Sequence, residues 1–431
     1  MEQLNQSHVW HPYTPGISGN EICIDRAEGE FLYTKDGRKI LDCISSWWVN
    51  THGHAHPYIA EAIGKQAHKL EQVIFAGFTH EPAENLANRL LPFLPGKMDK
   101  VFYSDNGSTA VEVAIKMALQ FFHFQNSPRR RIVALRNAYH GDTFGAMAVG
   151  ERGPFSAAFK DHLFDVSFID PPYSHYQEGT SAPDLSSHLE QAKEILSQPD
   201  VAAIIVEPLL QGAGGMLMYP EEWLESVFEI ASELGVLTIA DEVFTGFYRT
   251  GKPFATSGLR ISPDIICLSK GLTAGFLPTG ITVANEKVVK PFQENSYART
   301  FYHGHSFTAN PLACAAAIAS LDLIEESGFP EKVALIAELQ RIFARKVHAE
   351  YPMLEARHLG TVFALTLKAA DGLDYTHPLR HKIYAWFMEK DILLRPIGNV
   401  MYMVPPYCME SHELEKVHDA ILEFLEEIHR G

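Results

Sequence analysis

The stretch I-A-D-E-V-F-T-G-F-Y-R-T-G…P-D-I-I-C-L-S-K-G-L, residues 239–272, decides the fold of this chain. Its two short apolar runs, Leu237 to Ala240 and Ile265 to Leu268, predict buried parallel strands. Each run ends in a single charged residue, Asp241 after the first and Lys270 after the second. Because ligands bind at the carboxyl ends of strands in open α/β sheets, we expect both charges at one ligand site.

An acid and a lysine at that edge match the needs of pyridoxal phosphate. The lysine amine binds covalently to the aldehyde of this cofactor, and the carboxylate keeps the pyridine nitrogen protonated so that the ring can accept electrons. The same two residues would also form an ordinary buried ion pair, since structural pairs occupy such positions too. The pair alone leaves both interpretations open.

Composition narrows the class of protein. The chain has 431 residues, 46% hydrophobic and 21% charged, as in ordinary folded proteins, and this length suggests two or three domains. The net charge of -17 argues against a nucleic-acid partner, because phosphate binding needs a basic surface. The first residues lack the features of a secretory signal, no run has the length of a membrane span, and the five cysteines are scattered. We therefore expect a cytoplasmic protein with reduced thiols and no membrane association.

Further strands and a helix are predicted between residues 101 and 284, which extends the α/β pattern. Val101 to Ser104 predicts a strand, and a helix opens at Ser108, where free N–H groups and a positive dipole end suit a phosphate. Arg131 to Leu135 predicts the next strand, and Tyr139 after it could stack on a flat ring or simply pack. Residues 150–195, rich in Pro, Ser and His, predict loops around a short strand at 166–169. Two more strands are predicted at 201–206 and 280–284.

Two motifs carry weak signals. Gln211-Gly-Ala-Gly-Gly215 lacks the third glycine of a dinucleotide loop because Leu217 takes its place, which weighs against a nicotinamide dehydrogenase. Thr51-His-Gly-His-Ala-His56 has no acidic or cysteine ligand near it, so we expect no metal ion there.

Beyond about residue 328 the pattern predicts a smaller α+β unit. Helices are predicted at 330–348 and 378–390, strands at 362–367, 393–396 and 400–404, and a final amphipathic helix that Ser411 caps. We divide the chain into an N-terminal segment, 1–50, that packs with the small domain and active site, a large cofactor-binding domain, 51–327, and a small domain, 328–431.

With these residues in place, the chain resembles the class III, fold-type I pyridoxal-phosphate aminotransferases over nearly its whole length. D-E-V-F-T-G-F-Y-R-T-G and S-K-G-L carry the resemblance, which implies an α/β fold with a mostly parallel seven-stranded sheet, and ping-pong transamination. It also implies that Lys270 binds the cofactor and moves the proton, with Asp241 as the partner of the ring nitrogen. The other implied cofactor contacts are Gly107 and Ser108 at the phosphate, Tyr139 on the ring, and Ser306, which reaches the phosphate of the other subunit in a homodimer.

Three further elements resemble the branch of this family that acts in biotin biosynthesis. They are W-H-P-Y-T at 10–14, S-S-W-W at 45–48 and R-N-A-Y-H-G-D-T-F-G-A-M at 136–147. The resemblance implies transfer of an amino group from S-adenosylmethionine to 8-amino-7-oxononanoate. It also implies four substrate contacts: Tyr13, a catalytic candidate beside Lys270 and Asp241; Trp47 in the cavity wall; Asp142 near the substrate amine; and Arg395 on the distal carboxylate.

Two positions depart from the patterns of relatives. Many relatives that act on ω-amino acids place an arginine where this chain has Tyr402, masked by the glutamate that matches Glu207. That switch is absent here, and Tyr402 becomes a substrate-cavity residue. An ω-amino acid or diamine aminotransferase remains the alternative, and lysine could replace adenosylmethionine as donor. His305 stands where the best-known members have proline, and Ser306 replaces a threonine but keeps the hydroxyl.

Overall fold

A seven-stranded sheet forms the centre of the protein, whose computed structural model describes residues 8–14, 21–127, 129–173, 184–367 and 374–430. The strand order is β4-β12-β11-β10-β7-β5-β6. β12 is antiparallel to its neighbours β4 and β11, and the other pairs are parallel. The α/β class and the mostly parallel sheet are confirmed. The strands are β4 (Met98–Ser104), β5 (Arg131–Leu135), β6 (Val166–Ile169), β7 (Val201–Val206), β10 (Leu237–Asp241), β11 (Ile265–Leu268) and β12 (Gly280–Asn285).

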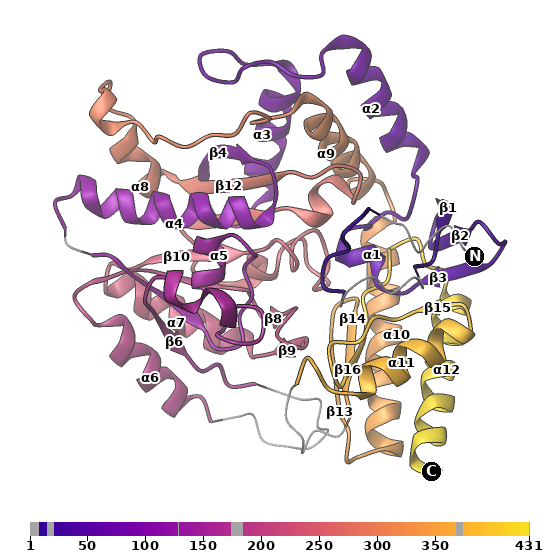
Figure 1. Ribbon diagram of the computed structural model, residues 1–431. Helices are drawn as coiled ribbons and strands as arrows, with labels where there is room; N and C mark the ends of the chain where they lie inside the picture. The colour runs from indigo at the N-terminus through magenta and orange to yellow at the C-terminus, as the bar shows by residue number, and fades with distance from the viewer. Residues whose placement is uncertain (1–7, 15–20, 128, 174–183, 368–373, 431) are drawn as a thin grey trace.

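Helices cover both faces of this sheet, so its central strands are apolar on both sides (Figure 1). Ile132 and Ala134 of β5 pack with α4 (Gly107–Phe124), while the alternate residues Val133 and Leu135 pack with α6 (Ser186–Leu196) and α7 (Glu221–Glu233). At the other end of the sheet, α3 (Glu81–Phe93) and α9 (Pro311–Ile324) cover the face opposite α4.

The C-terminal part has a sheet of its own, β13 (Glu355–Leu359), β14 (Val362–Thr366) and β16 (Val400–Met403), all antiparallel. It packs with α10 (Phe329–Glu350), α11 (Leu379–Glu389) and α12 (Ser411–Arg430). A further sheet joins the N-terminal strands β1 (Ile24–Glu28), β2 (Phe31–Thr34) and β3 (Lys39–Asp42) to β15 (Ile392–Leu393), which pairs in parallel with β3. Figure 1 shows the N-terminal strands beside the C-terminal helices, so two distant segments of the chain meet next to the central sheet.

Four elements differ from the sequence predictions. The stretch 150–195 is not all loop, because α6 and the 3-10 helix η2 (Ala157–His162) lie in it; the apolar face of α6 is sparse, with only Ala192 and Leu196 fully buried. β13 was missed because its sequence E-A-R-H-L is largely polar, yet the buried Arg357 donates to the carbonyls of Gly215 and Met216. The strand predicted at 393–396 is instead β15 (Ile392–Leu393), and it does not reach Pro396, which has no N–H to donate to a sheet.

Two of the three histidines of residues 51–56 contact other polar side chains. His54 Nε2 lies 2.9 Å from the Asp42 carboxylate, and His52 Nε2 lies 3.2 Å from the Ser320 hydroxyl. In the part of the chain that the structure describes, no group of three or more His, Cys, Asp or Glu side chains is placed to hold a metal ion. None of the helices in the described ranges is both long enough and apolar enough to cross a membrane.

Candidate active site

Asp241 and Lys270 lie at the carboxyl ends of two neighbouring parallel strands. Asp241 pairs with Cys267 across β10 and β11, and Lys270 follows three residues after Cys267. Lys270 begins the 3-10 turn η4 (Lys270–Thr273) with a φ of +40°, in the left-handed region that residues other than glycine rarely adopt. Such backbone strain persists where the surrounding structure fixes it, and it is frequent at functional sites.

The Asp241 carboxylate is buried and has two partners. Its Oδ2 accepts from Nδ1 of His140 at 2.6 Å, and its Oδ1 accepts from the Val243 N–H at 3.1 Å. His140 is also buried, and its Nε2 has no partner among the described residues. Sequence analysis did not single out His140, although it follows Tyr139 directly. The His140 contact fixes the orientation of the Asp241 carboxylate.

The Lys270 amine lies among aromatic rings. Its Nζ is 4.7 Å from the ring centre of Trp48 and 5.4 Å from that of Phe244. Burial lowers the pKa of Lys270 to about 8, although Asp241 and Glu207 act in the opposite direction. A lower pKa leaves more of the amine neutral near pH 7, and the neutral amine is the form that attacks a carbonyl.

A cavity of about 340 Å³, here called the inner cavity, joins these charges to the start of α4. Asn106 caps α4 by accepting from the Thr109 N–H at 3.0 Å. Gly107 and Ser108 follow in the first turn, where N–H groups have no partner within the helix. Residues on the inner-cavity wall include Trp48, Val49, Asn106, Gly107, Ser108, Tyr139, His140, Gly141, Glu207, Asp241, Val243, Phe244, Ser269 and Lys270.

The donor and acceptor groups of the inner cavity fit pyridoxal phosphate. The helix start suits the phosphate, Asp241 suits a protonated ring nitrogen, and Lys270 suits the aldehyde. The backbone is tightly packed at the phosphate end, because a Cβ on Gly107 would lie 2.8 Å from Val243 Cγ1 and one on Gly141 would lie 2.0 Å from Ser108 Oγ. Glycine at both positions lets the backbone come close to a ligand.

Tyr139 stands on the wall of the inner cavity, and its backbone is fixed by Glu207. The Tyr139 N–H donates to the Glu207 carboxylate at 2.9 Å, and the Gly212 N–H donates to the same carboxylate at 3.0 Å. Burial raises the pKa of Glu207 to about 7; nearby His140 opposes this rise and Asp241 adds to it. Within the described ranges no arginine forms a salt bridge with Glu207.

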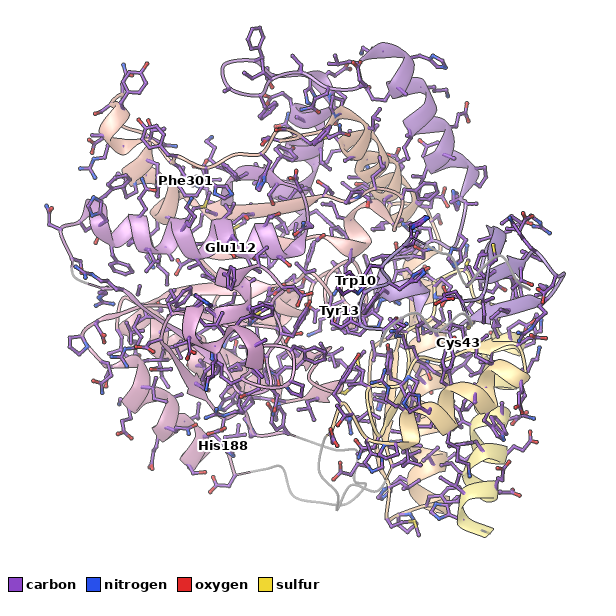
Figure 2. The ribbon with its side chains drawn as sticks, viewed as in Figure 1. Trp10, Tyr13, Cys43, Glu112, His188 and Phe301 are labelled. Carbon is purple, nitrogen blue, oxygen red and sulfur yellow. The ribbon has the colours of Figure 1, made fainter. Side chains whose placement is uncertain are left out.

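A second cavity of about 370 Å³, the outer cavity, adjoins the inner one and shares Trp48, Val49, Tyr139 and Lys270 with it. It brings together the predicted substrate residues from the N-terminal segment, the turn after β5 and the C-terminal part. Figure 2 shows Tyr13 in the middle of the molecule, between these parts. The remaining residues of the outer-cavity wall are Tyr13, Trp47, Asp142, Phe155, Ala213, Tyr375, Arg395, Pro396, Ile397 and Tyr402.

Tyr13 and Asp142 form a polar pair at this wall. The Tyr13 hydroxyl donates to the Asp142 carboxylate, and burial together with this hydrogen bond raises the pKa of Tyr13 to about 12. The Tyr13 ring meets Trp47 with ring centres 5.4 Å apart. Tyr13 is therefore a neutral hydrogen-bond donor near pH 7 and a wall of the cavity at the same time.

Arg395 supplies a cation to the outer cavity. Its guanidinium carbon lies 5.2 Å from the ring centre of Trp47, and no carboxylate of the described residues lies within salt-bridge distance of it. Tyr402 is buried, and its hydroxyl accepts from Nε1 of Trp48 at 3.2 Å. The outer cavity thus combines aromatic walls with a partly buried arginine that is available to an anionic ligand.

A strained turn presents the two indoles. Ser45, Ser46 and Trp48 have φ values of +51°, +60° and +66°. The buried Asp42 carboxylate accepts from the N–H groups of Ile44 and Ser46, at 3.0 and 2.6 Å. The Ser45 hydroxyl donates to the Val404 carbonyl at 2.7 Å. These bonds fix the turn in a conformation that residues other than glycine rarely adopt.

Ser306 lies outside both cavities of its own chain. It is exposed, and its carbonyl accepts from the Gln72 side chain at 3.1 Å. The neighbouring His305 places Nδ1 3.2 Å from the Asp105 carboxylate, and His303 contacts His305 with their Nε2 atoms 3.2 Å apart. The loop that carries Ser306 is therefore tied to the turn just before α4.

Three residues of these cavities were missed by sequence reasoning. Phe155 and Tyr375 face the outer cavity from loops, with ring centres 4.5 Å apart, and His140 contacts Asp241. Loop aromatics show no periodicity that a single sequence could reveal. His140 could have been identified, because it lies in the motif 136–147 near Tyr139 and Asp142, which were both predicted as site residues.

Comparison with known proteins agrees with this geometry. The sequence profile of the family described as aminotransferase class-III matches residues 15–425. The chain belongs to the class III aminotransferases, which are pyridoxal-phosphate-dependent transferases. Within this family it is similar to the adenosylmethionine-8-amino-7-oxononanoate aminotransferases of Synechococcus elongatus and Geobacter sulfurreducens. The Synechococcus protein is 47% identical over 422 residues, which cover 98% of this chain and 99% of the relative. The Geobacter protein is 36% identical over 440 residues, which cover 98% of this chain and 96% of the relative.

Solved structures show the same fold. The adenosylmethionine-8-amino-7-oxononanoate aminotransferase of Methanocaldococcus jannaschii superposes with a TM-score of 0.89 at 34% identity, over 97% of each chain. An omega transaminase from Pseudomonas jessenii, in complex with PMP, superposes with a TM-score of 0.89 at 25% identity, over 97% of this chain and 96% of the other. Shared architecture alone does not separate these two activities, so the substrate must be argued from the cavities.

Proposed function

We propose that this aminotransferase moves an amino group from S-adenosylmethionine to 8-amino-7-oxononanoate and forms 7,8-diaminononanoate, a reaction of biotin biosynthesis in the cytoplasm. The observation that carries the proposal is Arg395, a partly buried cation without an acidic partner among the described residues, which lies over Trp47 in the outer cavity. Relatives at up to 47% identity carry the name of this reaction, which adds support.

The inner cavity would hold the cofactor through the groups that fit it. Gly107 and Ser108 would bind the phosphate, Tyr139 would lie against the ring, and Lys270 would attach it covalently. When bound, pyridoxal phosphate supplies an aldehyde that exchanges amines and a ring that accepts electrons from the substrate carbon. Asp241, held by His140, would keep the ring nitrogen protonated through a charge-assisted hydrogen bond.

Lys270 would also move the proton. When not attached to the cofactor, its Nζ amine would act as the base that takes a proton from the substrate carbon and then as the acid that returns one. A pKa of about 8 places Lys270 near the pH of the cell, where both of its protonation states are accessible. Trp48 and Phe244, which stand over the amine, limit the access of water to it.

The outer cavity would recognise the acceptor at both ends. Arg395 would bind the distal carboxylate, the aromatic side chains of Trp47 and Tyr13 would enclose the apolar chain, and Asp142 would lie near the substrate amine. The resemblance puts Tyr402 where ω-amino acid aminotransferases have an arginine, and the Tyr402 hydroxyl accepts from Trp48.

The proposed assembly is a homodimer. We infer that Ser306, exposed and outside the cavities of its own chain, reaches the phosphate bound by the other subunit. Two shared active sites would then lie at the subunit interface.

A substrate comparison tests the proposed function. Holoenzyme should convert 8-amino-7-oxononanoate to 7,8-diaminononanoate, detected by mass spectrometry, with adenosylmethionine as donor. It should transfer amino groups from ω-amino acids or diamines to pyruvate at least a hundredfold more slowly. If the pyruvate reaction is faster, the ω-amino acid aminotransferase is the correct function.

A further inference from the structure

A side cavity of about 160 Å³ lies beside the outer cavity, and the function proposed above leaves it without a ligand. Its wall includes Asn137 after β5 and the loop of residues 150–156 after α5 (Phe144–Ala148). The two hollows share Tyr139, Asp142 and the ring pair Phe155–Tyr375, whose centres are 4.5 Å apart. The outer cavity and the side cavity therefore adjoin each other at these residues.

The loop of the side cavity is preformed. The Glu151 N–H donates to the Ala138 carbonyl at 2.8 Å, and the Gly153 N–H donates to the Ser156 hydroxyl at 3.0 Å. Arg152 fixes the same loop by donating to the carbonyls of Gly150 at 2.9 Å and Met147 at 3.2 Å. A ligand that enters this cavity does not have to order the loop first.

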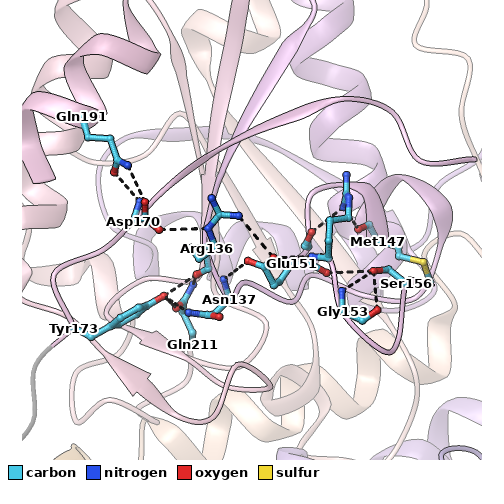
Figure 3. A network of polar contacts seen from close by, with 12 residues as sticks. Arg136, Asn137, Met147, Glu151, Gly153, Ser156, Asp170, Tyr173, Gln191 and Gln211 are labelled. Atoms are coloured by element: carbon cyan, nitrogen blue, oxygen red, sulfur yellow. Dashed lines mark hydrogen bonds and ion pairs between the residues drawn. The ribbon is translucent and has the colours of Figure 1, made fainter. Parts of the chain in front are cut away.

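Glu151 is the polar centre of the side cavity. Its Oε2 accepts from the Asn137 N–H and its Oε1 from the Arg152 N–H, both at 2.9 Å, and Arg136 lies 3.8 Å from Oε1 (Figure 3). Each carboxylate oxygen has two lone pairs, so acceptor capacity remains after these contacts. The Glu151 side chain is 27% exposed, which leaves it accessible to a ligand.

The side cavity and the outer cavity differ in the charge of their walls, so they suit different chemical groups. The outer cavity contains Arg395, which suits a carboxylate. Among the described residues that form the side-cavity wall, there is no lysine or arginine, and the charged ones are Asp142 and Glu151. The side cavity fits a ligand group that carries no negative charge. This group should be flat enough to lie against Phe155 and should donate hydrogen bonds.

We infer that the side cavity binds the purine end of a nucleoside-bearing amino donor, with Phe155 against the base and Glu151 accepting from its amino group. This inference rests on the proposed function and assigns the donor a subsite that the acceptor does not use. Phe155 and Glu151 are then specificity residues for the donor, while Arg395 is one for the acceptor. A donor such as lysine, which has no base, leaves the side cavity empty.

Adenosine tests the subsite directly, because it carries the base without a reacting amine. Calorimetry on the holoenzyme should show adenosine binding to the wild type. The Phe155→Ala variant should bind it about five- to hundredfold more weakly, the range for removing one aromatic ring from a stacked base. Phe159→Ala is the matched control, because Phe159 is similarly exposed, lies four residues further on and lines neither the outer nor the side cavity. Absence of adenosine binding, or equal loss in both variants, would overturn the inference.

Half-reactions separate the donor subsite from a structural effect. In the Glu151→Gln variant, single-turnover bleaching with adenosylmethionine should need about tenfold more donor. Bleaching with lysine and reoxidation by 8-amino-7-oxononanoate should stay within twofold of wild type. Equal damage with both donors would mean that Glu151 supports the loop and does not bind the base. If the wild type used no donor with this acceptor, the proposed function itself would fail.

Discussion

At the scale of single residues, the two charges proposed for the chemistry, Asp241 and Lys270, lie at the ends of strands. Asp241 and Lys270 could be chosen from sequence because each follows a buried strand, and parallel strands bring their ends to one edge. His140, Phe155 and Tyr375 could not be chosen in this way. Their positions depend on loop conformations, which hydrophobic periodicity does not encode.

Lys270 predicts a pH dependence for cofactor attachment. Burial lowers its pKa to about 8, so the neutral amine becomes dominant as pH rises through that value. The rate at which apoenzyme attaches pyridoxal phosphate covalently should therefore increase between pH 7 and 9 and then level off. Stopped-flow absorbance measures this rate. A rise centred near pH 10.5 would show that the amine has the pKa of an exposed lysine.

Asp241→Asn should slow the chemical steps by orders of magnitude. An amide does not stabilise a protonated ring nitrogen as a carboxylate does, while the phosphate contacts at α4 are untouched. Cofactor content should stay near that of wild type, and single-turnover rates should fall with both substrates. Rates within a few-fold of wild type would assign the ring nitrogen to another acid.

Arg395→Ala should damage one half-reaction more than the other. Loss of a charge-assisted pair of about 1.5–3 kcal/mol corresponds to a rise of roughly 10- to 100-fold in the Michaelis constant for 8-amino-7-oxononanoate. The donor half-reaction should change much less, because adenosylmethionine has no carboxylate at that distance from its reacting carbon. If both half-reactions suffer equally, Arg395 holds a carboxylate common to both substrates, and the ω-amino acid reading regains support.

At the scale of elements, sequence reasoning succeeded where the pattern was strong and local. The strands 131–135, 166–169, 201–206 and 265–268 were placed correctly because they are apolar runs between polar segments. β2 and β3 form an antiparallel hairpin whose turn contains Asp36-Gly37, and Gly37 has the positive φ, +92°, that such a turn favours. β13 was missed because Arg357 is buried through tertiary carbonyl contacts, which no local pattern reveals.

The turn of Ser45 to Trp48 gives a prediction at this scale. Asp42→Asn replaces a carboxylate that accepts from two N–H groups and contacts His54 by an amide, whose NH₂ cannot accept, at a cost of about 1.5–3 kcal/mol in unfolding free energy. The Trp47 wall should become less ordered, and the Michaelis constant for the oxononanoate should rise several-fold while cofactor content stays constant. Chemical denaturation and steady-state kinetics measure the two effects. Asp391→Asn is the control, because it breaks an exposed ion pair with Arg38 near β15. Its effects on the unfolding free energy and on the Michaelis constant should each be at most about a third of those of Asp42→Asn.

At the scale of the whole molecule, the fold class and the mostly parallel sheet were predicted, but the pairing of β3 with β15 was not. These strands are some 350 residues apart in sequence, and only the folded chain reveals their contact. The division at residues 50 and 328 stays a prediction. So does the homodimer, because the structure describes one chain.

Hybrid dimers test whether Ser306 serves the other subunit. A dimer of one Lys270→Ala subunit and one Ser306→Ala subunit should keep one site with the cofactor affinity of wild type, because the intact lysine meets the intact serine of its partner. A dimer of wild type with a doubly substituted Lys270→Ala, Ser306→Ala subunit should bind cofactor at its surviving site about 10-fold more weakly, since one charged hydrogen bond is lost. The reverse order of affinities would place Ser306 in its own subunit's site.

The bonds that fix the indole turn also set an order of events during protein synthesis. All of the inner-cavity wall except Trp48 and Val49 comes from residues 106 to 279, which are synthesised before the last 150 or so residues. The Ser45–Trp48 turn cannot take its final form then, because Tyr402 and Val404 supply two of its anchors. Domains fold as units during translation, N-terminal ones first. Most of the groups proposed to hold the cofactor are therefore synthesised before the residues that anchor the turn on the substrate side.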